Sequence, residues 1–66
     1  MDIILEGIET AIEEEIADQK KYKKLKEKAD DQKLKALFEQ LIQDEEKHEE
    51  ILRSRYEAVK KMINDD

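Results

Sequence analysis

Three residues with metal-binding side chains stand within otherwise apolar positions of this sequence: Glu15, Glu45 and His48. Glu45 and His48 are three residues apart, and residues at that spacing share one face of a helix, so both side chains can reach the same ligand. Carboxylate oxygens with one imidazole nitrogen accept Fe, Mn, Co or Zn ions. A Glu-x-x-His spacing alone is common in a Glu-rich chain, so its weight depends on the elements that carry it.

Those elements are two predicted helices. The chain has no Pro and one Gly, and it is rich in Ala, Leu, Glu, Lys and Gln, which favour helix. We predict helices over about 2–29 and about 32–63, joined by a turn at about 30–31 with Asp31 capping the second helix. One continuous helix is the alternative. The apolar residues recur at helical spacing and form what we call the apolar stripe: Ile4, Ile8, Ala11, Ile12, Tyr22, Leu25, Ala29, Leu34, Leu37, Phe38, Leu41, Leu52, Val59 and Met62.

Glu15, Glu45 and His48 occupy positions that this periodicity assigns to the core. Glu15 lies seven residues after Ile8 and seven before Tyr22, which are both on the apolar stripe. In an antiparallel hairpin, all three residues are about 15–17 residues from the turn and therefore lie at one height. Burying unpaired carboxylates costs several kcal/mol. The sequence therefore predicts a divalent cation in this layer.

The chain is too short to bury a large core alone. It has 66 residues and no Cys, so a metal or a partner chain is needed for stability. Two helices of about 40–45 Å cover only one flank of each other. We predict an all-α fold with one domain over residues 1–66: an antiparallel two-helix hairpin that dimerises into a four-helix bundle. Two divalent ions would balance the four carboxylates of the dimer's layer.

The charge and hydropathy of the chain limit its partners. A net charge of −6 argues against nucleic acid or an anionic membrane as the main partner. No apolar run approaches the ~20 residues of a membrane span, and the first residues lack the features of a signal peptide. The absence of Cys fits a reducing compartment. We expect a cytoplasmic protein.

The combined motifs resemble the rubrerythrin branch of the ferritin-like superfamily. Glu15 precedes Tyr22 by seven residues and Glu45 by thirty, and Glu45 opens the Glu-x-x-His pair. The resemblance covers about residues 8–56. The matching segments are Ala11–Glu15, Tyr22, Leu37–Leu41 and Asp44–His48.

The resemblance implies a role for each ligand. Glu15 looks like a terminal carboxylate ligand, Glu45 like the carboxylate that bridges two metals, and His48 like the terminal imidazole ligand. Members of the family usually carry two helix pairs in one chain, whereas this chain carries one, so a homodimer or a larger oligomer of dimers would restore the four helices. The family's Cys-rich iron site is absent, which implies a separate electron donor.

The function implied by the resemblance is that of a non-haem di-iron (or di-manganese) carboxylate protein. Two Fe ions per dimer would be shared between two chains and react with peroxide or oxygen, without catalytic residues beyond the ligands. Two alternatives stay open: a ferroxidase for iron storage or delivery, and a metal-free helical interaction module. We expect Asp18 at the solvated edge of the layer, and Tyr22 and Tyr56 as packing residues with solvated hydroxyl groups.

Overall fold

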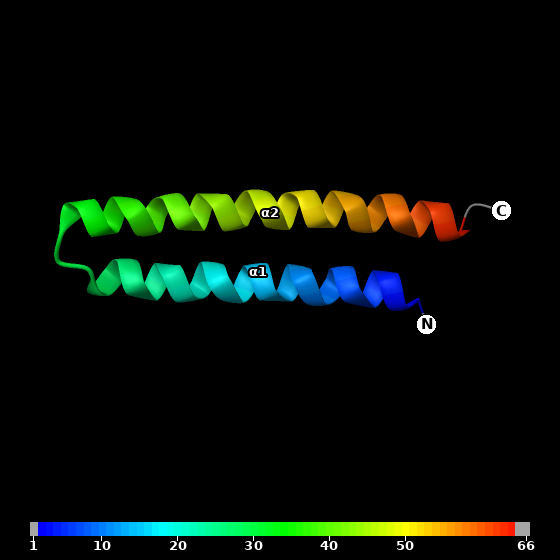
Figure 1. Cartoon of the computed structure of the whole chain (residues 1–66), viewed down its shortest axis with the longest axis horizontal. Coiled ribbons are helices and arrows are strands. Elements are labelled where there is room, and N and C mark those ends of the chain that lie inside the picture. Colours follow the sequence, from blue (N-terminus) through cyan, green and yellow to red (C-terminus); the bar gives the residue numbers. More distant parts are fainter. Residues whose placement is uncertain (1, 65–66) are drawn as a thin grey trace.

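The computed structural model describes residues 2–64, which form two helices and no strand. Helix α1 spans Ile3–Lys28 and helix α2 spans Gln32–Asn64. They lie antiparallel and side by side, with the turn at one end of the hairpin and the first turn of α1 and the last turns of α2 toward the other (Figure 1). The predicted all-α hairpin is confirmed, and the alternative of one continuous helix is wrong. The predicted helix bounds differ from the observed ones by one residue at three ends.

Local side-chain bonds explain where the helices begin. The Asp2 carboxylate accepts hydrogen bonds from the backbone N–H groups of Ile4 and Leu5, at 2.9 and 3.0 Å. These groups have no partner within the helix, so Asp2 acts as an N-cap. Gly7 lies inside α1 without breaking it. A Cβ atom added to Gly7 would meet nothing within 4 Å.

The turn forms where the polar break in the sequence predicts it. Ala29 leaves the helical conformation, with φ −73° and ψ 132°. Asp31 Oδ1 accepts from the backbone N–H of Lys33 at 2.9 Å, so Asp31 caps α2. Lys26 and Lys28 lie in the last turn of α1, where positive charge meets the negative end of the helix dipole.

The core between the two helices is thin. Ile12 and Ile42 are the buried apolar residues of the described chain, with 8% and 4% of their surface exposed. Much of the apolar stripe is uncovered, and exposed apolar side chains of this size favour contact with another protein surface. The exposed members of the stripe are Ile4, Leu25, Leu34, Leu37 and Met62.

Neither helix within residues 2–64 combines the length and low charge needed to cross a lipid bilayer.

Candidate metal centre

The structure brings the three predicted site residues together. Glu15 comes from α1, and Glu45 and His48 come from α2. One ligand atom from each lies within 4.8 Å of the other two. Glu15 and His48 are near the middle of their helices, so the cluster lies halfway along the hairpin. The three residues were predicted to lie at one height because they are equally far from the turn, and in the structure they do lie close together.

Glu15 carries an unusual oxygen atom. Its Oε2 is buried and has no hydrogen-bond partner in the described part of the chain. The ring of His48 can carry the opposite charge, but its Nδ1 lies 3.5 Å from Glu15 Oε2, which is too long for a hydrogen bond. A buried carboxylate oxygen without a donor is destabilising and rare. A cation beside this atom would remove that cost.

The Glu15 carboxylate also affects the pKa of Glu45. The pKa of Glu45 is raised, first because its protonated form can donate a hydrogen bond to the Glu15 carboxylate and then by burial, with the negative charges of Glu15 and Asp18 adding to the effect. The charge of His48 lowers the pKa of Glu45 and so opposes these effects. Two ionised carboxylates this close repel each other, and this repulsion favours a proton on Glu45 more than in the free side chain. A divalent ion can take the place of that proton.

The donor set fits a divalent transition metal. Donors on one ion at about 2.0–2.2 Å lie at most about 4.4 Å apart, and the 4.8 Å span of this cluster requires only a small closure of the side chains. One hairpin supplies three ligand residues, which leaves further positions of an ion to be filled. The His48 side chain is 57% exposed, so the cluster is open to the surface on one side.

Neighbouring residues have identifiable partners. Asp18 forms an ion pair with Lys21 at 3.8 Å. The Tyr22 ring stacks on Phe38 with ring centroids 6.4 Å apart, and Lys21 Nζ lies 4.9 Å from the Tyr22 centroid. Tyr22 therefore serves packing between the helices in this structure.

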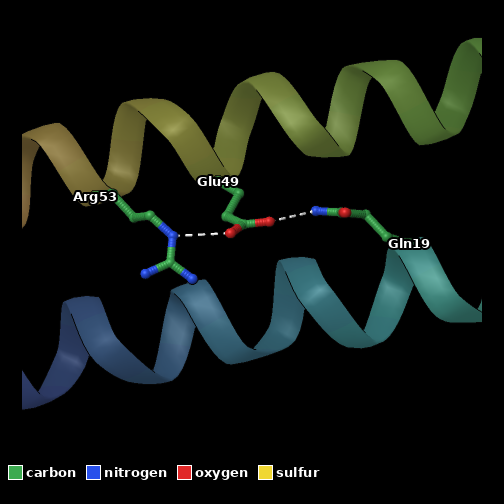
Figure 2. A network of polar contacts seen from close by, with 3 residues as sticks. All are labelled: Gln19, Glu49 and Arg53. Atoms are coloured by element: carbon green, nitrogen blue, oxygen red, sulfur yellow. Dashed lines mark hydrogen bonds and ion pairs between the residues drawn. The ribbon is translucent and has the colours of Figure 1, made fainter.

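A polar network beside the cluster was not anticipated from the sequence. Gln19 of α1 is buried and hydrogen-bonds Glu49 of α2, which also contacts Arg53 (Figure 2). Gln19 follows the buried Ile12 by seven residues, and this heptad spacing was the available signal. Two further side-chain pairs join the helices: Lys26 with Glu39, and Tyr56 with Glu9, each at 2.8 Å.

The fold and the cluster together define an all-α hairpin with a carboxylate–histidine group. The family model for rubrerythrin matches residues 6–65, which is nearly the whole chain. The chain belongs to the rubrerythrin family, as the resemblance indicated. Members of this family typically bind iron. Comparisons with curated proteins and with solved structures gave no significant match.

Proposed function

We propose that this protein is a non-haem di-iron carboxylate protein in which Glu15, Glu45 and His48 are the metal ligands. The observation that supports it best is the convergence of one potential ligand atom from each of the three side chains, in a cluster where Glu15 Oε2 is buried without a hydrogen-bond partner among the described residues. Family membership supports iron as the metal, although manganese suits the same donors.

The proposal extends to sharing of the metal pair between two chains. A single hairpin leaves His48 open to the surface and leaves much of the apolar stripe uncovered. His48 follows Leu34 by fourteen residues and precedes Met62 by fourteen, so heptad spacing places it on the same uncovered face. A second hairpin on that face would bury the stripe and bring two clusters together. Four carboxylates and two imidazoles would then hold two divalent ions.

The activity that we propose is redox chemistry of the rubrerythrin type. A bound iron pair would supply electrons for the reduction of peroxide or oxygen, and a separate donor would supply the replacement electrons. Glu15 and Glu45 contribute negative charge and ligand orientation, and His48 contributes a neutral nitrogen donor. The apolar stripe, covered by the second chain, limits access of water. We also propose a cytoplasmic location, because a chain without Cys fits a reducing compartment.

Native mass spectrometry after anaerobic loading with Fe(II) tests the proposal. The expected result is a dimer, or a multiple of dimers, with two metal ions per pair of chains. An assembly without metal would overturn it and favour the metal-free interaction module. Catalytic removal of peroxide with an added reductant would support the redox role, whereas repeated oxidation of excess Fe(II) as substrate would favour the ferroxidase.

A further inference from the structure

A buried amide joins α1 to α2 close to the ligand cluster. Gln19 has 9% of its surface exposed and is the buried polar residue of the described chain. Its Nε2 donates to Glu49 Oε1 at 2.8 Å, and Arg53 Nε donates to Glu49 Oε2 at 2.8 Å. Figure 2 shows Glu49 reaching from α2 toward Gln19 while Arg53, on the same helix, holds its other oxygen. We call these three residues the polar clamp.

A carboxylate lies at the centre of the polar clamp. Glu49 accepts one hydrogen bond across the interface from Gln19 and a second from Arg53. Hydrogen bonds to a charged acceptor are stronger than those between neutral groups. The bond from Gln19 to the Glu49 carboxylate is therefore stronger than a bond between two neutral side chains.

Gln19 and Glu49 each lie one helical turn from a ligand on their own helix, in opposite directions along the antiparallel hairpin, so the bond between them crosses the height of the cluster. Gln19 follows Glu15 by four residues on α1, and Glu49 follows Glu45 by four residues on α2. Residues at this spacing are neighbours on a helix surface. A bond between Gln19 and Glu49 therefore restrains the rotation of both helices at the height where the ligands meet.

Rotation matters because the ligand atoms project from the helices. Side-chain ends lie about 5–6 Å from the helix axis, so a rotation of about 40° moves them by about 4 Å. That displacement is comparable to the 4.8 Å span of the whole cluster. The turn at Ala29 is fourteen residues from Glu15 and restrains sliding more than local rotation.

Apolar packing restrains this rotation weakly. Ile12 and Ile42 alone are buried apolar residues within the described range, and aliphatic contacts have little directional preference. Buried polar groups can select one arrangement of helices among several of similar energy. We propose that the polar clamp is a positioning device, which sets the relative rotation of α1 and α2 so that the three ligand residues converge. Its effect on metal binding rests on the function proposed above.

Co(II) binding, followed by the visible absorption of the bound ion, tests this role. In Gln19→Leu the clamp bond is lost, but an apolar side chain fills the site, so the unfolding temperature should not fall greatly. We expect Co(II) affinity to fall by about 10–100-fold, as for other residues that orient ligands. The matched control is Glu50→Gln, which changes the charge by the same amount as Glu49→Gln at an exposed neighbour. The control should bind like the wild type, and Glu49→Gln should bind more weakly.

Exchanging the amide and the carboxylate between positions 19 and 49 tests whether the bond itself, and not only the polarity of the site, positions the ligands. Gln19→Glu alone sets two carboxylates against each other and should weaken Co(II) binding. The double variant Gln19→Glu/Glu49→Gln restores an amide–carboxylate bond in the opposite direction and should recover most of the affinity. Failure of the double variant to recover, in a chain that circular dichroism reports as helical, would overturn the proposal.

A measurement without metal tests the polar clamp separately from the proposed metal site. The chain has no native Cys, so nitroxide labels can be placed uniquely at Glu13→Cys and Lys47→Cys, both exposed, with labelled chains diluted into unlabelled ones. The distribution of label distances should broaden in Gln19→Leu without any metal. An unchanged distribution would overturn the polar clamp whatever the Co(II) result. If the wild type binds no Co(II) but Gln19→Leu broadens the distribution, the metal site fails and the clamp's control of rotation stands.

Discussion

Replacing Glu45 with Gln should change stability in opposite directions with and without metal. The variant keeps the size of the side chain and removes its charge. In the metal-free protein, Glu15 and Glu45 present ligand oxygens within 4.8 Å of each other. Two unit charges at that distance repel by about 0.9 kcal/mol in water and about 3.5 kcal/mol at an effective dielectric constant of 20. Solvent screening favours the lower end, so we expect Glu45→Gln to stabilise the metal-free protein by about 1 kcal/mol.

The repulsion between Glu15 and Glu45 should also appear in the pH dependence of stability. Because the folded protein raises the pKa of Glu45 above its ordinary value of 4.5, the folded state binds a proton more readily than the unfolded chain. The stabilisation from that proton is fully present below about pH 4.5 and is lost as pH rises through the raised pKa. The stability of Glu45→Gln relative to the wild type should therefore increase over this window and then level off.

Metal should reverse the effect of the substitution. In the proposed site the Glu45 carboxylate is a ligand, so its loss should weaken binding of Co(II) or Fe(II) at least about 10–100-fold. Metal bound to the native state adds to stability in proportion to its affinity, so the loaded variant should melt below the loaded wild type. Urea unfolding followed by circular dichroism, with chelator and with Co(II), measures both signs. The control is Glu46→Gln, an exposed neighbour with the same charge change. A metal-free Glu45→Gln that is less stable than the wild type would refute the repulsion argument.

Three further substitutions test the fold and the assembly. Leu37→Ser replaces an exposed residue of the apolar stripe, so it should leave the helical signal intact but shift sedimentation from the proposed dimer toward monomer; unchanged sedimentation would contradict an interface at Leu37. Asp31→Ala removes the α2 cap and should cost about 1 kcal/mol in urea unfolding, and no loss would show that the bond to Lys33 contributes little. Gly7→Ala adds a methyl group in open space within α1, so the unfolding free energy should rise by up to about 1 kcal/mol; a decrease would contradict the open surroundings of Gly7.

Local and periodic features of the chain were readable without the tertiary structure. The helices follow from good helix formers and apolar spacing, and the turn follows from the polar break and the capping chemistry of Asp31. Convergence of Glu15, Glu45 and His48 also follows, because a fixed rise per residue converts equal distance from a turn into equal height. These properties depend on the backbone geometry of a single helix or hairpin.

The relative rotation of the two helices was decided by the tertiary structure alone. Periodicity places Gln19 near the interface but does not tell which side chain of α2 it meets, and here it meets Glu49. Periodicity likewise does not tell that Glu15 Oε2 has no donor among residues 2–64, whereas the two Glu49 carboxylate oxygens accept one hydrogen bond each. Such differences depend on displacements of a few ångströms between side chains thirty residues apart. Those displacements are set by the packing of α1 against α2, because helical spacing specifies a face and not the partner that the face meets.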